Sequence, residues 1–276
     1  MAYLCKVIFI QDEIMNHVLF FDIDGTLVSF ETHKVPQSAV EGLQKAHDRG
    51  NKIIISTGRP YCIINNLTEL QDRNLIDGYI TMNGSYCFAG DKVLYKSPIP
   101  AEDVATLCRI CAEHGYPCIV VTEKELKVVN PDSQVRMIFN EFLNVDEIDE
   151  TTFEEAQKSE VYQMTPFFDA EAETAIAPLM PGCEFNRWYP AFVDVTAKGN
   201  TKARGVMTML DSLGLPLSAS IAFGDGGNDV PMLKEAAVGV AMGNSAPDVQ
   251  KEADMVTDSV DNDGILNALK RLDIID

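Results

Sequence analysis

Two aspartates stand one residue apart, at the point where a run of apolar residues ends. Residues 18–21 are Val, Leu, Phe and Phe, and Asp22, Asp24 and Gly25 follow them closely. A buried strand that stops here places both carboxylates in the loop at its end. Carboxylates held in such a place need a cation, a proton or a covalent role to offset the cost of burying them. The segment therefore predicts a site of chemistry.

Three further polar clusters occupy the same kind of position. Thr57 and Gly58 follow a second apolar strand, and the glycine-rich loop 224–229 follows a third. Lys202 falls in the first turn of a predicted helix, for which Asn200 is the candidate N-cap. In an open α/β sheet, ligands bind at the edge formed by the carboxyl ends of the strands. We therefore expect the four clusters to meet at one edge.

The residue types suggest a metal and a phosphate at that edge. Asp22 and Asp225 can supply two hard anionic oxygens to Mg²⁺, which prefers a few carboxylates and fills its other positions with water and phosphate. Thr57 offers a hydroxyl and Gly58 a backbone N–H to phosphate oxygens. A lysine at a helix start is disfavoured by the helix dipole, and a bound anion would explain Lys202. A solvated lysine is the alternative.

The elements that carry these clusters alternate between strand and helix. Near-continuous apolar strands spaced by helices indicate an α/β fold with a Rossmann-like, doubly wound parallel sheet covered on both faces. From about residue 98 to 190 the pattern is acidic and more mixed, which is typical of a separate α+β unit. We predict the strands and helices of the sheet domain at 17–22, 36–49, 52–56, 60–70, 79–82, 200–213, 219–223, 231–237 and 238–241.

The chain is predicted to divide into three parts, with the inserted domain beginning somewhat before this change in pattern. Residues 1–85 form the first part of the core, with 1–14 as a peripheral extension. Residues 86–190 form the inserted domain, and 191–276 complete the core.

Composition restricts the partners and the compartment. The formal net charge is -20 over 276 residues, which disfavours binding to nucleic acid or to an anionic membrane. No window reaches the roughly 18 apolar residues that cross a membrane, and no secretion signal is evident at the start. Seven scattered cysteines are typical of reduced thiols in a cytoplasm. Cys108 and Cys111 form a C-x-x-C, for which core packing in a helix is favoured over a zinc site.

The four clusters together resemble the haloacid dehalogenase superfamily of phosphatases. The motifs are D-I-D-G-T-L at 22–27, the threonine of I-S-T-G-R-P at 55–60, the second lysine of K-G-N-T-K at 198–202, and G-D-G-G-N-D at 224–229. The last three are similar to the Cof-type branch, in which an α/β cap of type C2B is inserted between the second and third motifs. The resemblance covers nearly the whole chain except residues 1–14. The sequence is most similar in character to bacterial sugar-phosphate phosphatases that act on hexose phosphates.

This resemblance implies a role for each motif residue. Asp22 would be the nucleophile that forms an aspartyl phosphate, and Asp24 would be the general acid and then the general base. Asp24 must hold a proton, so its side chain should lie away from the metal. Mg²⁺ would be held by Asp22, Asp225 and the backbone carbonyl of Asp24, while Asp229 would orient Lys202 or a metal-bound water. The phosphoryl oxygens would be bound by Thr57, Gly58, Lys202, Asn228 and the backbone N–H of Ile23.

The implied substrate is a small phosphorylated metabolite, such as a hexose or pentose phosphate. A sugar phosphomutase and a phosphatase of nucleotides or cofactor phosphates are alternatives that use nearly the same site. A non-catalytic sensor and a receiver-like domain are disfavoured, because both aspartates and a large cap are present. The cap should set specificity, and Arg187 and Trp188 are candidates for substrate contact or for plain packing. The oligomeric state is open, and a monomer is compatible with the sequence.

Overall fold

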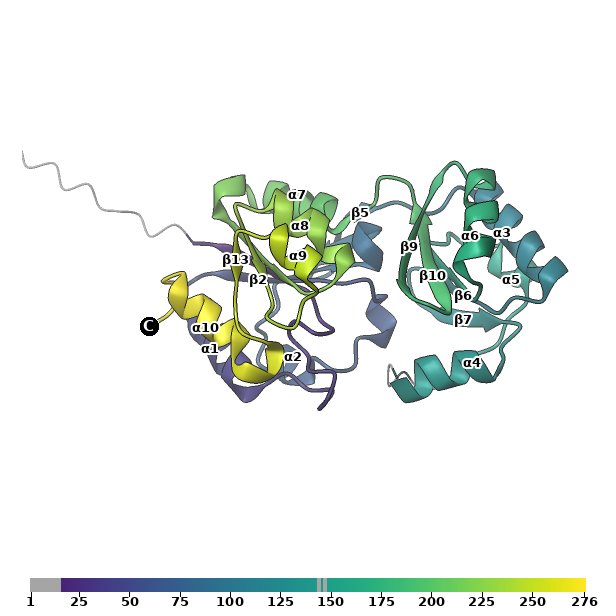
Figure 1. Ribbon diagram of the computed structural model, residues 1–276. Helices are drawn as coiled ribbons and strands as arrows, with labels where there is room; N and C mark the ends of the chain where they lie inside the picture. The colour runs from purple at the N-terminus through teal and green to yellow at the C-terminus, as the bar shows by residue number, and fades with distance from the viewer. Residues whose placement is uncertain (1–15, 143–144, 146–147) are drawn as a thin grey trace, which may run out of the picture.

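The computed structural model describes residues 16–276, with the exception of 143–144 and 146–147. The predicted peripheral extension, residues 1–14, lies outside the described residues. Within these ranges the strands form two sheets, one of eight strands and one of five, each covered by helices (Figure 1). No helix in the described ranges is both long enough and apolar enough to cross a membrane.

The larger sheet has the order β13-β12-β11-β1-β2-β3-β4-β5. The strands from β13 to β3 are parallel, and β4 and β5 add an antiparallel hairpin at one edge. In β1, Phe20 is paired with Ala222 of β11 on one side and with Ile54 of β2 on the other. The strand bounds are β1 Val18–Phe21, β2 Lys52–Ser56, β3 Gly78–Thr81, β4 Tyr86–Ala89, β5 Lys92–Lys96, β11 Ser220–Gly224, β12 Val238–Ala241 and β13 Met255–Val256.

Helices cover both faces of this sheet, because the side chains of β1 alternate between two apolar layers. Leu19 and Phe21 pack in the layer that holds α1, α2 and α10. Val18 and Phe20 pack in the layer of α7, α8 and α9. The predicted doubly wound α/β core is thus confirmed. The helix bounds are α1 Gln37–Asp48, α2 Thr68–Asp72, α7 Lys202–Leu213, α8 Val230–Glu235, α9 Pro247–Lys251 and α10 Gly264–Arg271.

The smaller sheet forms the inserted cap, with antiparallel neighbours in the order β7-β6-β8-β10-β9. One face packs against α3 and α6, and Cys108 and Cys111 lie buried in that cluster, as their predicted packing role requires. The other face packs against α4 and the π-helical turn η3. The bounds are α3 Ala101–His114, β6 Cys118–Val121, β7 Leu126–Val129, α4 Ser133–Arg136, η3 Met137–Phe142, α5 Phe153–Ala156, β8 Gln163–Pro166, α6 Ala170–Ile176, β9 Cys183–Tyr189 and β10 Phe192–Ala197.

Both predicted boundaries of the inserted domain are wrong by several residues. The predicted start at residue 86 is the first residue of β4, yet β4 and β5 belong to the larger sheet. The predicted end at residue 190 precedes β10, which lies inside the cap sheet between β8 and β9. The chain leaves the core only after the antiparallel edge hairpin β4–β5. It returns to the core only after the cap hairpin β9–β10. The crossings therefore lie near residues 97 and 198.

The helix predicted from Pro60 to about Leu70 is also wrong. A single 3₁₀ turn, η1 Tyr61–Ile63, is followed by α2, which begins only at Thr68. Ile64 has a ψ of 90°, and Arg59 donates from Nη1 to the carbonyl of Ile63 at 3.4 Å. A side chain thus takes a carbonyl that a continuous helix would use, in a stretch of β-branched residues and asparagines that favours helix weakly.

Candidate active site

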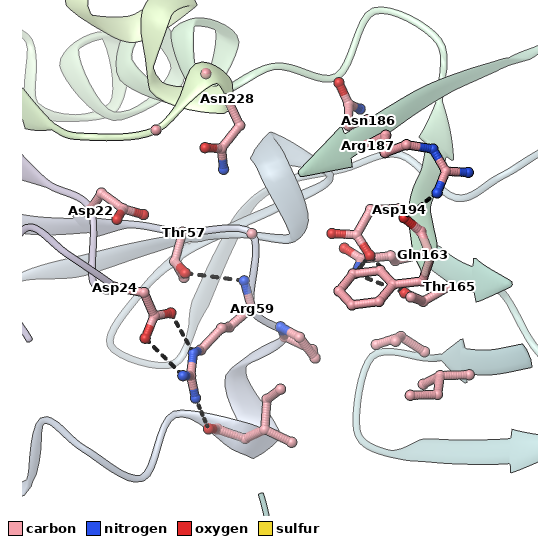
Figure 2. Close-up of a pocket in the computed structure, with 18 of the residues that line it drawn as sticks. Asp22, Asp24, Thr57, Arg59, Gln163, Thr165, Asn186, Arg187, Asp194 and Asn228 are labelled. Carbon is pink, nitrogen blue, oxygen red and sulfur yellow. Dashed lines mark hydrogen bonds and ion pairs between the residues drawn. The ribbon is translucent and has the colours of Figure 1, made fainter. Parts of the chain in front are cut away.

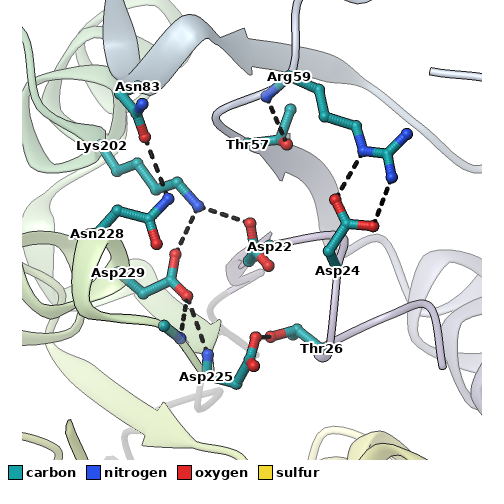
Figure 3. Close-up of polar contacts among 11 residues, drawn as sticks. Asp22, Asp24, Thr26, Thr57, Arg59, Asn83, Lys202, Asp225, Asn228 and Asp229 are labelled. Carbon is teal, nitrogen blue, oxygen red and sulfur yellow. Dashed lines mark hydrogen bonds and ion pairs between the residues drawn. The ribbon is translucent and has the colours of Figure 1, made fainter. Parts of the chain in front are cut away.

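The motif residues meet at the carboxyl edge of the larger sheet, as predicted. Asp22 follows β1, Thr57 follows β2 and Asp225 follows β11, and these three strands are direct neighbours. Lys202 is the first residue of α7 and reaches the same place (Figure 3). Adjacent parallel strands end at the same edge, so residues distant in sequence share one site.

Lys202 is a buried partner of two aspartates. Its Nζ donates to Oδ1 of Asp22 at 2.6 Å and to Oδ1 of Asp229 at 2.5 Å, and its side chain is 0% exposed. Burial alone would lower the pKa of Lys202, but the two carboxylates outweigh burial and raise it. The alternative of a solvated lysine is therefore excluded.

The cap of α7 differs from the prediction. The N-cap is Thr201, whose hydroxyl accepts from the N–H of Arg204 at 3.2 Å. Asn200 is buried instead and donates to the hydroxyl of Ser85 and to the carbonyl of Ser97. These bonds tie the start of α7 to both ends of the β4–β5 hairpin.

Three carboxylates crowd around the lysine. Single oxygens of Asp22, Asp225 and Asp229 lie within 4.8 Å of one another. Burial raises the pKa of Asp22 well above its usual value, and Asp229 adds to this while Lys202 opposes it. Burial, followed by Asp229, raises the pKa of Asp225 to about 7. One lysine does not neutralise three carboxylates, so the cluster favours a second cation.

The hydrogen bonds show which of these carboxylates suit a cation. Oδ2 of Asp229 accepts from the N–H groups of Asp225 and Gly226, both at 2.9 Å, and Oδ1 holds Lys202. Asp229 is thus engaged in bracing the loop. All three aspartates line the cavity, and Asp225 accepts from the hydroxyl of Thr26 at 3.0 Å and from Nδ2 of Asn244 at 3.4 Å. A pair of carboxylates facing open space matches the donor set of Mg²⁺.

Gly25 allows this approach. Its φ is +85°, and a Cβ there would lie 2.3 Å from Oδ2 of Asp225. A larger residue would be strained and would push Asp225 out of the cluster.

The side chain of Asp24 is turned toward Arg59, away from Asp22 (Figure 3). Its carboxylate accepts from Nε of Arg59 at 2.7 Å and from Nη2 at 2.8 Å (Figure 3). Such a two-point pair is among the stronger ionic contacts in proteins. Arg59 follows Thr57 by two residues in the T-G-R-P turn, and this contact with Asp24 was not predicted from the sequence.

Three of the five predicted phosphate-binding residues lie around the same opening. Thr57, Gly58 and Asn228 line the cavity. Asn228 donates from Nδ2 to Oδ1 of Asn83 at 3.2 Å, a contact that sequence reasoning missed. Ile23 is fully buried, and its carbonyl accepts from three N–H groups of the loop that follows. Lys202 is not among the residues that line the cavity, because it lies behind Asp22 and Asp229.

A cavity of about 580 Å³ joins the core and the cap. Figure 2 shows Asp22, Thr57 and Asn228 on the core side, facing Gln163, Thr165 and Asp194 on the cap side. The two groups face each other because β8 and β10 of the cap sheet lie opposite the edge of the core sheet where β1 and β2 end. This size suits a small ligand that is enclosed from both sides.

Arg187, one of the two candidates for substrate contact, is occupied. Its Nε donates to Oε2 of Glu173 at 2.6 Å, and Nη2 donates to the carbonyl of Phe168 at 2.9 Å. Nη1 donates to the carbonyls of Pro190 at 2.9 Å and Phe192 at 3.0 Å. The packing role is therefore the one that the structure supports. The side chain of Trp188 lies outside the described residues.

Known proteins share this arrangement over most of the chain. The haloacid dehalogenase-like hydrolase family matches residues 19–269. The solved structure of BT4131, a sugar phosphatase of HAD subclass IIB, superposes with a TM-score of 0.90 at 55% identity, over 94% of this chain and 100% of that one. YkrA of Bacillus subtilis (strain 168) is 31% identical over 94% of this chain and 99% of its own length. The pyridoxal phosphate phosphatase YbhA of Escherichia coli (strain K12) is 26% identical over 91% and 96%.

The family match and the sheet-edge cluster agree on the chemistry. The matched range begins within β1 and ends within α10, so it spans the core and the inserted cap. The predicted resemblance is thereby confirmed. The chain belongs to the haloacid dehalogenase-like hydrolase family and is a phosphoric monoester hydrolase.

Proposed function

We propose that this enzyme is a Mg²⁺-dependent phosphatase of small sugar phosphates, hexose or pentose phosphates, that works through an aspartyl phosphate. The observation that carries the proposal is the position of Asp22. Its carboxylate is held by Lys202 on one side and lies beside Asp225, at the core end of a cavity closed by the cap. Charge and position are what phosphoryl transfer requires of a protein.

The first step is attack by a carboxylate oxygen of Asp22 on phosphorus. The bond between phosphorus and the sugar oxygen breaks, and Asp24 delivers a proton to that oxygen, so that the sugar leaves as an alcohol. For this, the Asp24 side chain must leave Arg59, take up a proton from solvent, and turn toward the leaving oxygen. Arg59 therefore holds the Asp24 side chain in the conformation that precedes the reaction.

The second step hydrolyses the aspartyl phosphate and regenerates the free enzyme. Asp24 takes a proton from water, the water oxygen bonds to phosphorus, and the bond to Asp22 breaks to release inorganic phosphate. Thr57, Gly58, Asn228 and the N–H of Ile23 would hold the phosphoryl oxygens through both steps. Lys202 would fix the orientation of Asp22 and offset charge that builds on the phosphoryl group.

Magnesium fits the acidic cluster. Asp22, Asp225 and the backbone carbonyl of Asp24 would hold it, and Asp229 would orient Lys202 or a water of the metal. When bound, Mg²⁺ supplies positive charge to the carboxylate and phosphate oxygens. The raised pKa of Asp225, caused by burial and by Asp229, supports the need for a cation there.

The sugar is inferred from two lines of support. BT4131, at 55% identity, is named a sugar phosphatase, and the cap wall of the cavity carries polar groups suited to hydroxyls. A phosphatase of another small phosphometabolite is the alternative that a relative favours, because YbhA is named for pyridoxal phosphate.

A panel of substrates tests the proposal. The purified enzyme with Mg²⁺ should release phosphate from hexose and pentose phosphates faster than from nucleotides or pyridoxal phosphate. The reverse order would replace the substrate class, and isomer interconversion of glucose 6-phosphate without phosphate release would identify a mutase. Asp22→Asn should abolish turnover while the thermal melt stays cooperative. Retained turnover would remove Asp22 as the nucleophile.

A further inference from the structure

A compact polar cluster on the cap faces the active site. Oδ1 of Asp194, on β10, accepts from Oγ1 of Thr165 at 2.7 Å and from Nε2 of Gln163 at 3.1 Å, both on β8. All three residues are at least 95% buried. Burying three polar side chains in a sheet face, one of them a carboxylate, is costly unless they have a task.

The cluster lies on the wall of the cavity opposite Asp22, the proposed nucleophile. Gln163, Thr165 and Asp194 line the same cavity as Asp22 and Thr57, from the opposite wall (Figure 2). A substrate whose phosphoryl group sits at Asp22 would therefore extend its leaving group toward this cluster.

One acceptor in the cluster lacks a partner. Oε1 of Gln163 is buried and makes no hydrogen bond to any of the described residues. Its amide nitrogen is fixed by Asp194, which sets the direction of the amide group. A buried acceptor without a donor is destabilising, so a ligand that brings a donor gains from binding here.

The walls around the cluster are mostly apolar. Besides Asn186 and Arg187, the rest of the cap side consists of aliphatic and aromatic side chains, namely Ile119, Val121, Leu126, Phe139, Phe185 and Phe192. An apolar wall with a few convergent polar groups is the usual form of a small-molecule site. A sugar matches it, because its hydroxyl hydrogens can reach the acceptors while its C–H faces lie on the rings.

The charges at the cap end of the cavity disfavour a second phosphate group on the substrate. Among the described residues that line the cavity, the cations are Arg59 and Arg187. Arg59 is paired with Asp24, and Arg187 is paired with Glu173 and with backbone carbonyls. Asp194 adds a carboxylate, and both arginines among the described residues of the lining are already engaged, so a second phosphate at the cap end is disfavoured.

We propose that Asp194, Gln163 and Thr165 form the subsite that binds the hydroxyl groups of the leaving group. This inference rests on the proposed function and extends it. The subsite selects a neutral polyol, accepts hydrogen bonds from it, and discriminates against bisphosphates.

The test compares substrates with and without hydroxyl groups. Asp194→Asn and Gln163→Met keep side-chain size and remove acceptors, and the readout is kcat/KM for a hexose 6-phosphate divided by kcat/KM for p-nitrophenyl phosphate. Each variant should lower this ratio about tenfold, mainly through KM for the sugar, since unpaired donors weaken binding. The control is Thr174→Val, which changes an exposed residue on α6 of the cap that does not line the cavity and should leave the ratio unchanged.

The outcomes separate this inference from the proposed function. The wild-type enzyme should prefer hexose monophosphates to hexose bisphosphates by about tenfold or more, and Asp194→Asn should narrow that preference. An unchanged ratio in both variants, or a wild-type preference for bisphosphates, would overturn the subsite. A wild-type enzyme that hydrolyses p-nitrophenyl phosphate but no sugar phosphate would overturn the proposed substrate class. Because Gln163→Met leaves the bond between Asp194 and Thr165 in place, it tests the subsite even if Asp194→Asn fails to fold.

Discussion

Replacing Lys202 by methionine is the most direct test of how the site is built. The change keeps the length of the side chain and removes the charge that Asp22 and Asp229 share. The side chains of the three residues are 0%, 10% and 1% exposed, so water cannot take over the role of the lysine.

The size of the effect follows from this burial. Removing one partner of a buried ion pair costs about 3–5 kcal/mol, because the remaining charge is left without compensation. Here two carboxylates lose their partner, so we expect the upper end, about 5 kcal/mol at pH 8. For a chain of this length that corresponds to a fall in Tm of about 10–20 °C. The loss should shrink toward pH 5, where a carboxylate in the cluster can take up a proton.

The assay is a thermal melt at pH 8 and pH 5, with two further variants. Lys198→Met removes an exposed lysine four residues earlier and should change stability by less than about 0.5 kcal/mol. Lys202→Met combined with Asp229→Asn should recover part of the loss, because an amide can keep the bonds to the loop and donate to Asp22. A fall in Tm below about 2 °C for the single variant would show that Lys202 is not the counter-charge of this cluster.

Three other outcomes are expected. Asp225, with its pKa raised to about 7 by burial and Asp229, keeps its proton in the folded state up to that pH, whereas the unfolded chain releases it near 3.8. The stability of the metal-free protein should therefore fall as the pH rises from about 4 to about 7. The rise in Tm on adding Mg²⁺ should be larger at pH 8 than at pH 6, because the metal then does not have to displace a proton. Equal rises in Tm at the two pH values would contradict this expectation. Asp24→Asn should give a burst of one nitrophenolate per enzyme from p-nitrophenyl phosphate and then stall, because that leaving group needs no acid while the second step needs a base; full steady turnover would refute it. Arg187→Lys should lower the Tm of the cap by a few degrees without changing inhibition by phosphate, since lysine cannot reproduce the planar set of bonds from the guanidinium to Glu173 and to three backbone carbonyls. A change in phosphate affinity alone would instead indicate a ligand role.

Much of the core site could be predicted from sequence, for a simple reason. Asp22, Thr57 and Asp225 each follow a short apolar strand, and parallel strands bring such residues to one edge without any further information. Lys202 could be placed there because a lysine at a helix start conflicts with the helix dipole.

Contacts between distant segments could not be predicted. Arg59 pairs with an aspartate 35 residues away, and Gln163 with one 31 residues away, and neither pairing has a local signature. The cap subsite depends on the register of two antiparallel strands, which single-sequence patterns specify weakly. Asn200 was expected to cap its helix, but bonds to the β4–β5 hairpin draw it into the interior. That hairpin was predicted to belong to the cap, although the acidic, mixed pattern begins only near residue 98, and its pairing with β3 could not be predicted.

The order of the strands in the core sheet also determines when this protein can fold on the ribosome. β1 is central, yet its partner β11 lies about 200 residues later in the chain, so one side of β1 stays unpaired while the whole cap is synthesised. At about 5–20 residues per second, that interval lasts roughly 10–40 s. The cap, whose sheet is continuous in sequence from β6 to β10, has all its strands before the core does. The nascent chain therefore carries a complete cap on an unfinished core, with an apolar strand edge exposed, and nucleophile and metal ligands come together only in the last stage of synthesis.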